Sequence, residues 1–491
     1  MNQGPPIFLG LDLGSSAVKA VAARGHSVIA QASAELTIQS PRPGWSEQAP
    51  DDWIGAAAKA CRTVAEALGP ETSAIAGIGL SGQMHGATVL DADRRPLRPC
   101  ILWNDSRSAP QCRSLAERLP GLAMRAGVPP MPGFTAPKLL WIAEHEPEVY
   151  SRIRHVLLPK DYLGLWLHGD LATDRSDAAG TLWLDEARGA WDQELCEISA
   201  TDPAWLPPVR AGTDPVGRLR SEAAAACGLS PGLPVFAGGG DAATGAVSIG
   251  ATRPGRGFVS LGTSGQLFLC TDGYRPNPAR MVHAFAHTLP DTHYQMACML
   301  NGARPLAWYA EILGCPVAEL VNSAAEADRA RAPIFLPYLT GERSPHADPY
   351  IRGAFFGLED ATRRAETAYA VMEAIAFTFA DAAESFGESL DAAPHLLAVG
   401  GGTRSQALLQ LIADTTGRRI GRSDGAEAGP ALGAALLAAV GAGTMDETAL
   451  ARSPEVSLWL EPGEPDALML ERLARYRALY EALAPLNQPA E

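Results

Sequence analysis

The sequence predicts an α/β protein made of two halves with related architecture. Three observations predict it: apolar strand-like runs alternate with amphipathic helical patterns, glycine-rich turns follow several of those runs, and one hairpin pattern occurs twice. Alternation of strands and helices indicates sheets that are largely buried between helices. A pattern repeated about half a chain apart favours two related domains over an array of many short repeats.

The duplicated hairpin lies at residues 8–23 and again at residues 258–271. Each copy has an apolar strand, a turn of glycine and hydroxyl residues, and a second strand in which apolar residues alternate, which is typical of a β-hairpin. When the copies are aligned on their Leu-Gly pairs, Asp12 of the first stands opposite Ser260 of the second. The two turns therefore share glycine and hydroxyl groups, but only the first has an acid beside it.

The remaining elements follow from local patterns. The segment "DDWIGAAAKACRTVAEAL" predicts a helix with an acidic first turn, and "AIAGIGL" predicts a strand. "PVFAGGGDAATGAVSIG" and "LLAVGGGTRSQALLQLIADTTG" each predict a strand, a glycine-rich turn and a helix, the second ending at Gly417. "ALGAALLAAVGAG" at 431–443 predicts a small-residue helix packed inside the protein. Glycine, proline and arginine in "SIGATRPGRG" predict a boundary between domains of residues 1–248 and 249–491.

Composition excludes several classes of function. The net charge is -15, from 40 Lys+Arg against 55 Asp+Glu, and no basic run exceeds a pair, so we expect no nucleic-acid partner. Because this charge repels anions at long range, a phosphate site must be built from local backbone amides and a metal ion. The eight cysteines form no CxxC pair, which indicates reduced thiols. We find no signal peptide or run long enough to cross a bilayer, and expect a cytoplasmic protein without a membrane partner.

The first hairpin turn has the residues of a phosphate and metal site. Asp12 stands near the end of an apolar strand and is followed by Gly14, Ser15 and Ser16. Such a turn presents backbone N–H groups to phosphate oxygens, while the carboxylate can hold Mg²⁺ directly or through water. Lys19 follows and could reach the same phosphate. The alternative is an ordinary β-hairpin turn without a ligand.

The second hairpin turn favours the functional interpretation of the first. It repeats the small and hydroxyl residues as Gly262, Thr263 and Ser264 but has no carboxylate. A purely structural repeat has no reason to keep these groups in both turns. Two phosphate-binding turns, only one of them acidic, are suited to a nucleoside triphosphate whose metal ion lies to one side.

Asp241 is the candidate general base. It follows three glycines and precedes an alanine-rich helix, at the carboxyl end of a strand, where α/β folds bind ligands. A carboxylate there could accept the proton of an attacking hydroxyl during phosphoryl transfer to an alcohol. The alternative is a helix N-cap, for which Asp is well suited. A second glycine run, at 400–402, could let a flat ring or a ribose lie against the backbone.

The bend at residues 79–91, "GLSGQMHGATVLD", is a candidate ligand contact. Gln83, Met84 and His85 lie between two glycines, at the end of a predicted strand and before another. Small residues let the backbone pass close to a ligand, and the polar, adaptable side chains between them could touch a small molecule. The alternative is a tight hairpin in which the histidine bonds only a backbone carbonyl.

Together these segments resemble the FGGY family of carbohydrate kinases over nearly the whole chain. "GFTAPKLLWIAEHEP" resembles the first family signature, with Thr135 and Lys138 in place, and "GAFFGLEDATRRAETAYAVME" resembles the second, with Thr367 where an aliphatic residue is usual. The other matching motifs, in chain order, are "LDLGSSAVK", "GQMHGATVLD", "LWNDSR", "LLPKDYL", "SDAAGTLWLD", "GGGDAATGA", "SLGTSG", "LPYLTGERSPH" and "GGGTRS".

The resemblance implies two domains of the actin-like, ribonuclease-H-like ATPase fold with a ligand cleft between them. It implies ATP and Mg²⁺ as cofactors, Asp241 as proton acceptor and Asp12 as the acid near the metal and the γ-phosphate. Met84 and His85 match the pair that contacts the sugar, with Trp103, Asn104 and Asp105 in a motif close by. On the nucleotide side the matching residues are Thr263, Gly401, Gly402 and Ser405.

The expected reaction is ATP-dependent phosphorylation of a ketose, with D-xylulose at O5 as the first candidate. Similar sequences usually have Asn after the base, whereas this chain has Ala242, and a lost polar contact commonly costs about 1 kcal/mol. A kinase for ribulose or an alditol is therefore the alternative, and a nucleotide-driven binding protein of the actin or chaperone type is another. A homodimer is expected from the resemblance alone.

Overall fold

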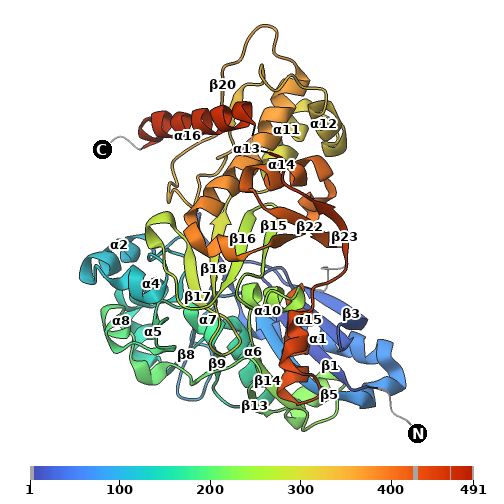
Figure 1. Cartoon of the computed structure of the whole chain (residues 1–491). Helices are drawn as coiled ribbons and strands as arrows, with labels where there is room; N and C mark the ends of the chain where they lie inside the picture. Colours follow the sequence, from blue (N-terminus) through green and yellow to red (C-terminus); the bar gives the residue numbers. More distant parts are fainter. Residues whose placement is uncertain (1–4, 424–428, 465, 489–491) are drawn as a thin grey trace.

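The computed structural model describes residues 5–423, 429–464 and 466–488. The chain forms two lobes, one mainly from its N-terminal half and one mainly from its C-terminal half (Figure 1). Each lobe is built around one large sheet, of six strands in the first and seven in the second. The predicted α/β class with two related halves is confirmed.

The N-terminal sheet contains the first duplicated hairpin. Its spatial order is β13 (Pro215–Arg218), β14 (Pro234–Gly240), β5 (Ile75–Gly82), β1 (Ile7–Leu13), β2 (Ala17–Arg24) and β3 (Ser27–Glu35). Strands β14, β5 and β1 are parallel, whereas β1, β2 and β3 pair antiparallel. Alternate residues of β1 face opposite sides, so that Leu9 packs with helix α1 (Pro50–Leu68) and Phe8 packs on the other face.

The N-terminal lobe also contains several smaller elements. The strands are β4 (Glu47–Gln48), β6 (Thr88–Leu90), β7 (Cys100–Ile101), β8 (His155–Leu157), β9 (Thr173–Asp174), β10 (Leu184–Asp185), β11 (Ala190–Trp191) and β12 (Val209–Arg210). The helices are α2 (Ala109–Arg118), α3 (Leu122–Ala126), α4 (Thr135–His145), α5 (Pro147–Arg152), α6 (Pro159–His168), α7 (Arg175–Ala179), α8 (Gln193–Ile198) and α9 (Ser221–Cys227).

The C-terminal sheet contains the second hairpin. Its spatial order is β17 (His283–Ala286), β18 (His293–Met299), β16 (Gly265–Thr271), β15 (Gly257–Leu261), β21 (His395–Val399), β22 (Arg419–Ser423) and β23 (Val456–Leu460). β15 and β16 pair antiparallel, like β1 and β2, so the predicted duplication is confirmed. The other elements are α11 (Arg304–Leu313), α12 (Val317–Ala324), β19 (Ile334–Leu336), β20 (Ala354–Phe356), α13 (Arg364–Ser385), α14 (Gln406–Thr416) and α16 (Ala467–Asn487).

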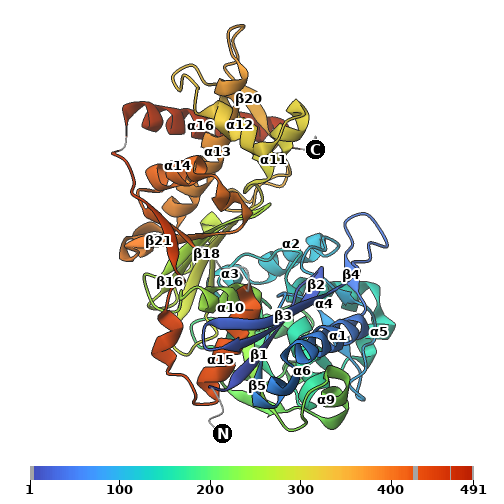
Figure 2. The ribbon, with the colours of Figure 1, turned by 90° about the vertical axis from the view of Figure 1, so that its right-hand side faces the viewer.

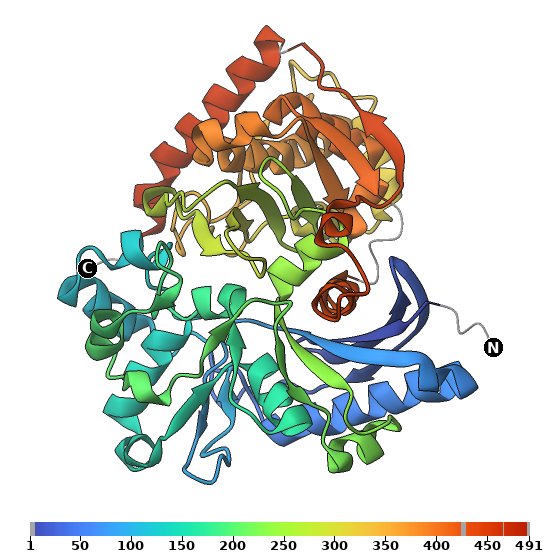
Figure 3. The ribbon, with the colours of Figure 1, turned by 60° about the horizontal axis from the view of Figure 1, so that its bottom comes forward.

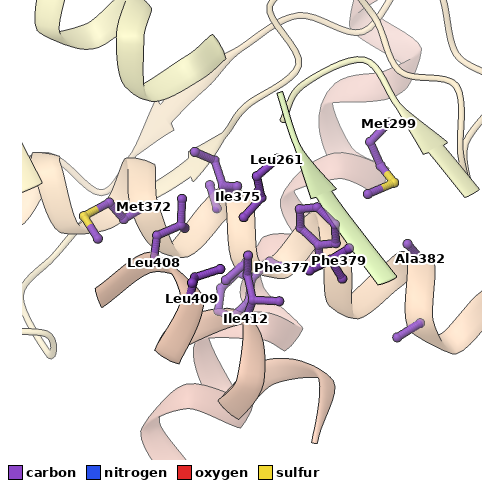
Figure 4. Packing of buried hydrophobic residues seen from close by; sticks show 14 of the residues in the cluster. Leu261, Met299, Met372, Ile375, Phe377, Phe379, Ala382, Leu408, Leu409 and Ile412 are labelled. Carbon is purple, nitrogen blue, oxygen red and sulfur yellow. The ribbon is translucent and has the colours of Figure 1, made fainter. Parts of the chain in front are cut away.

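Apolar side chains of α13 and α14 cover the C-terminal sheet. Figure 4 shows Ile375 and Phe377 of α13 packed with Leu408 and Ile412 of α14, close to Leu261 at the end of β15. The Thr367 hydroxyl, also on α13, donates to the carbonyl oxygens of residues 363 and 364, so its polarity is satisfied within its own helix. The end of the second hairpin therefore rests on a rigid, densely packed base.

Two helices lie between the two sheets (Figure 2). Helix α15 (Gly429–Gly441) comes from the C-terminal half but packs on the N-terminal sheet, on the face opposite α1 (Figure 3). A Cβ at Gly10 or Gly79 would lie within 1.9 Å of a carbonyl oxygen of α15, so only glycine permits this approach. Helix α10 (Asp241–Ser248) crosses α15 where Gly433 meets the Thr244 backbone.

The local predictions are largely confirmed. The helix after the acidic turn is α1, and the two strand–glycine–helix units are β14 with α10 and β21 with α14, which ends at Gly417 in a left-handed conformation. All eight cysteines are unpaired, and seven are buried. No helix in the described part of the chain is long and apolar enough to span a membrane.

Candidate active site

A cavity of ≈ 320 Å³ lies where the two lobes meet. Asp241 and Ala242 of α10 line it on one side, and Ser260 and Gln266 of the second hairpin line it on the other. The glycine run after β21 and the first residues of α15 complete its wall. The cavity thus brings together the candidate base, the second hairpin and the second glycine run, which are far apart in the sequence.

Asp241 is the first residue of α10 and follows the last glycine of β14. Solvent in the cavity reaches its side chain, but protein surrounds the carboxylate closely enough to desolvate it. This desolvation, with a smaller contribution from the nearby Asp12 charge, raises the pKa of Asp241 to about 7, against the opposing effect of the Ala242 backbone N–H. A carboxylate with this pKa is suited to accept a proton near neutral pH.

Asp12 lies near the end of β1, opposite Lys19 of β2. Ser81 Oγ donates a hydrogen bond of 3.0 Å to Asp12 Oδ1 and lies 2.7 Å from Thr244 Oγ1, which connects the first hairpin to α10. Burial raises the pKa of Asp12 to about 6, although the Ser81 hydrogen bond and the Lys19 charge lower it. Asp12 and Asp241 are therefore two desolvated carboxylates that repel each other.

Such a pair fits a divalent cation. Mg²⁺ is commonly bound by one or two carboxylates, with substrate phosphates and water supplying the other ligands. In the described part of the chain, no three His, Cys, Asp or Glu side chains lie close enough together to hold a metal ion. Asp12 is followed in the chain by the glycine and hydroxyl turn at residues 14–16.

The bend between β5 and β6 holds His85 in a left-handed backbone conformation, with φ of 72°. Thr135 Oγ1 and Lys138 Nζ donate to the His85 carbonyl oxygen, at 3.2 and 2.8 Å, and Lys138 also donates to Gly133 O. His85 Nδ1 lies 2.7 Å from Gly180 O. Burial lowers the pKa of His85 to about 3, so the ring is neutral, with its hydrogen on Nδ1 and an acceptor at Nε2.

The other predicted sugar contacts differ in their availability to a ligand. Met84 is buried against Gly240, where a Cβ would lie 2.7 Å from Met84 Cγ. Trp103 is 42 % exposed, and Asn104 is exposed beside it. The two carboxylate oxygens of Asp105 accept hydrogen bonds from the backbone N–H of Ser46 and from Arg107. Because both oxygens are bonded within the protein, this geometry indicates that Asp105 stabilises the loop that carries Trp103 and does not contact a ligand directly.

The second turn is exposed at Thr263 and Ser264. Backbone bonds hold it, because the N–H groups of residues 302 and 303 donate to the carbonyl oxygens of Thr263 and Gly262. Gly402 packs against Leu261, so the second glycine run lies beside this turn. Ser405 Oγ caps helix α14 by accepting from Leu408 N at 3.2 Å, which gives this hydroxyl a structural task.

Comparisons with known proteins agree with this two-lobed site. Residues 7–248 match the N-terminal domain of the FGGY family of carbohydrate kinases, and residues 257–442 match its C-terminal domain. The chain belongs to the FGGY family. Xylulose kinase of Escherichia coli K12 is 40 % identical over 98 % of this chain and 100 % of its own. Xylulose kinase of Klebsiella pneumoniae is 42 % identical over 88 % of this chain and 90 % of its own.

Solved structures extend the likeness to the fold of this FGGY kinase. A crystal structure described as a xyloylose kinase from Brucella ovis has a TM-score of 0.93 and 42 % identity, covering 98 % of this chain and 100 % of its own. A xylulose kinase from Rhodospirillum rubrum has a TM-score of 0.90 and 28 % identity, covering 97 % and 99 %. The predicted two-domain FGGY fold is confirmed, whereas the boundary at residue 248 stays a prediction.

The structure adds residues of the FGGY kinase site that local sequence patterns did not identify. Lys138 was noted only as part of a family signature, yet it fixes the His85 carbonyl. Lys160 is buried and forms ion pairs with Asp161 and Asp174. Ser176 Oγ donates to Asp174 and accepts from the backbone N–H of Gly240, the residue before the candidate base. Lys160 and Asp161 lie in "LLPKDYL" and Ser176 begins "SDAAGTLWLD", so the polar residues of these two motifs were a sequence signal for part of this cluster.

Proposed function

We propose that this FGGY kinase transfers the γ-phosphoryl group of ATP to D-xylulose, with Asp241 as the general base. The observation that carries the proposal is the position of Asp241 in a cavity between the lobes, with a pKa raised to about 7 by burial and by Asp12. The near full-length similarity to proteins named xylulose kinase supports the choice of sugar.

Asp241 acts on the hydroxyl that is phosphorylated. As the sugar oxygen forms a bond to the γ-phosphorus, the bond from that phosphorus to the leaving ADP oxygen breaks and the hydroxyl proton passes to Asp241. With a pKa of about 7, about half of the free enzyme has an ionised base at neutral pH, and the protonated form can release its proton after the product leaves. The kcat/KM for the sugar, which reports the ionisation of the free enzyme, should therefore rise as the pH increases through 7.

Asp12 and the two turns act on the phosphates. Asp12 would hold Mg²⁺ directly or through water, and the bound ion would neutralise part of the phosphate charge. Backbone N–H groups at residues 15, 16, 263 and 264 are donors of the type that binds phosphate oxygens in turns, whereas those of Gly14 and Gly262 donate to carbonyl oxygens of their own hairpins. Positioning and electrostatic stabilisation supply most of the catalysis in phosphoryl transfer.

The bend and the Trp103 loop form the proposed sugar wall. A neutral His85 offers one acceptor at Nε2, while Lys138 and Thr135 keep its backbone in place. The indole ring of Trp103 supplies an exposed apolar surface against which the carbon atoms of a sugar can pack. Sugars bind in this way through a few hydrogen bonds and one or more flat apolar contacts.

Ala242 supports a second candidate, a kinase for a different ketose or a polyol. Ala242 lines the same cavity as Asp241 and has no polar side-chain group to donate to a hydroxyl. If this position selects the sugar, Ala242→Asn should change the ratio of kcat/KM between D-xylulose and the other sugars.

The compartment and the oligomeric state are further parts of the proposal. The eight unpaired cysteines support a function in a reducing compartment such as the cytoplasm. Sedimentation would test the proposed homodimer.

ADP release with Mg²⁺ and ATP, measured over a panel of ketoses, aldoses and polyols, tests the proposal. D-xylulose should give the highest kcat/KM, and the product should carry its phosphate on O5. A preference for a different sugar would contradict the D-xylulose assignment and keep the kinase. ATP binding without a response to any sugar would contradict the kinase assignment and favour a nucleotide-driven binding protein.

A further inference from the structure

The Ser15 hydroxyl connects the proposed sugar wall to the first phosphate turn. We propose that this hydroxyl is a positioning group that couples sugar binding to nucleotide binding, and that it does not itself contact phosphate. The inference rests on the proposed function, since it needs a sugar and a nucleotide at neighbouring sites. It differs from the expectation from sequence, in which Ser15 binds the nucleotide directly.

Both hydrogen-bonding directions of the Ser15 hydroxyl are in use. Ser15 Oγ donates to Gln83 Oε1 at 2.8 Å, and it accepts from Trp103 Nε1 at 2.8 Å. A serine hydroxyl has one hydrogen, so it cannot donate to a phosphate oxygen while it donates to Gln83. Because the Gly14 N–H donates to the Ala17 carbonyl oxygen, what the turn has left for a phosphate is the backbone N–H groups of residues 15 and 16 and the side chain of the exposed Ser16, whose positions depend on where Ser15 is held.

Gln48 closes these contacts into a ring. Gln83 Nε2 donates to Gln48 Oε1 at 3.2 Å, and Gln48 Nε2 donates to the backbone oxygen of Ser15 at 2.7 Å. Trp53 of α1 donates to Gln48 Oε1 at 3.0 Å and anchors the ring in the core. The side chain and the backbone of Ser15 are thus both tied to the wall that carries the bend.

The backbone gives a second connection on the other side of Gly14. The Gln83 N–H donates to the carbonyl oxygen of Leu13 at 2.8 Å. The turn is therefore fixed to the bend both before and after its glycine. A displacement of Gln83 by more than about 0.5 Å must move the turn or lengthen these bonds beyond the normal range of about 2.7–3.2 Å.

Trp103 is the most exposed member of the ring. Gln48 and Gln83 are 1 % and 2 % exposed, whereas Trp103 is 42 % exposed. Asp105 holds the Trp103 loop by accepting from the backbone N–H of Ser46 at 2.6 Å and from Arg107. A sugar packed on the indole ring would fix its Nε1–H against Ser15 Oγ, and so order the turn that receives the phosphates.

Coupling of this kind is reciprocal. If a sugar tightens nucleotide binding by some factor, the nucleotide must tighten sugar binding by the same factor. In proteins with coupled sites the factor is typically about 5- to 150-fold. Removing the connecting hydroxyl should lower the factor while leaving the affinity for each ligand alone nearly unchanged. A residue that contacts phosphate would behave differently, because its loss weakens nucleotide binding whether or not sugar is present.

The experiment is isothermal titration of the wild type and the Ser15→Ala variant with ADP and Mg²⁺, with and without saturating D-xylulose. In the wild type, D-xylulose should tighten ADP binding at least about 5-fold. In Ser15→Ala the factor should fall to within about 2-fold of one, with the Kd of ADP alone changed by less than about 3-fold, as expected for a group that leaves phosphate untouched. Ser15→Thr keeps the hydroxyl and should keep the coupling.

Ser46→Ala is the matched control. It removes a buried hydroxyl from the same wall, and Ser46 Oγ has no hydrogen-bond partner within the described residues. This variant should keep the wild-type coupling factor. Three results would overturn the proposal: no coupling in the wild type, unchanged coupling in Ser15→Ala, or loss of ADP binding in Ser15→Ala without sugar. Failure of the proposed function is recognised separately, by the absence of sugar-dependent ADP release in the wild type.

Discussion

The two hairpins share a backbone and differ in chemistry. β1 and β2 form a turn at residues 14–16, and β15 and β16 form one at 262–264. At matching positions the first hairpin has Asp12 and the second has Ser260. The side chains of Gln83 and Gln48 form hydrogen bonds with Ser15 in the first turn. In the second turn, the backbone N–H groups of residues 302 and 303 donate to the carbonyl oxygens of residues 263 and 262.

This difference indicates how a duplicated element was specialised. A carboxylate in both hairpins would place a third negative charge near Asp241, because Ser260 lines the same cavity as Asp241. The charge is instead confined to Asp12, which lies close enough to Asp241 to raise its pKa. In the proposed function both turns therefore contact phosphates, while the first hairpin also supplies the carboxylate for the metal ion.

Asp12→Ser makes the first hairpin like the second and should have the largest effect. Loss of the carboxylate that would hold Mg²⁺ removes electrostatic stabilisation of the transferred phosphoryl group, and kcat should fall about 10²- to 10³-fold. The KM for the sugar should change much less. Steady-state ADP release over a range of Mg²⁺ concentrations measures this. An unchanged kcat with an unchanged Mg²⁺ response would contradict the assignment of Asp12.

Ser260→Asp makes the second hairpin like the first and should have an intermediate effect. Ser260 lines the same cavity as Asp241, so the new charge would repel both the base and the nucleotide. One added charge pair of this kind weakens binding by about 10-fold, and the KM for ATP should rise accordingly. Ser260→Asn, which has a similar shape and no charge, is the matched control. A similar KM in both variants would show that size, and not charge, matters at this position.

The smallest effect concerns stability without metal. The pKa of Asp12 is raised by burial to about 6, so the folded state holds a proton that the unfolded state releases near pH 4. Wild-type stability should therefore fall relative to Asp12→Ser as the pH rises from 4 to 7. The relative change is at most about 3 kcal/mol. Urea unfolding in EDTA at both pH values measures it. A relative change of opposite sign would contradict the raised pKa.

Much of the fold could be predicted from local patterns. Both hairpins, the long first helix and the two strand–glycine–helix units are encoded by short stretches of alternating or helical periodicity. The position of α15 could not be predicted, because a helix that is apolar all round does not indicate which sheet it covers. Its close approach depends on Gly10 and Gly79, which are significant only once they are known to face the same helix.

The site was predictable in its residues more than in their roles. Glycine and hydroxyl patterns predicted both turns, and the family resemblance predicted Asp241 as the base and Met84 and His85 as sugar contacts, which stay predictions. The role of Lys138 could not be predicted, because it acts through the carbonyl of a residue 53 positions away. The contact from Trp103 to Ser15 spans 88 positions, and nothing near either residue indicates it. Which partner a hydroxyl bonds is a property of the folded chain.

Asp241→Asn tests the central claim most directly. This substitution keeps the size of the side chain and removes its ability to accept a proton. With D-xylulose, Mg²⁺ and ATP, the rate of ADP release should fall at least about 10²-fold, while the Kd for ADP measured by titration stays within about 3-fold of the wild type. A variant that binds ADP normally and still phosphorylates the sugar at a rate close to that of the wild type would contradict the assignment of Asp241 as the general base.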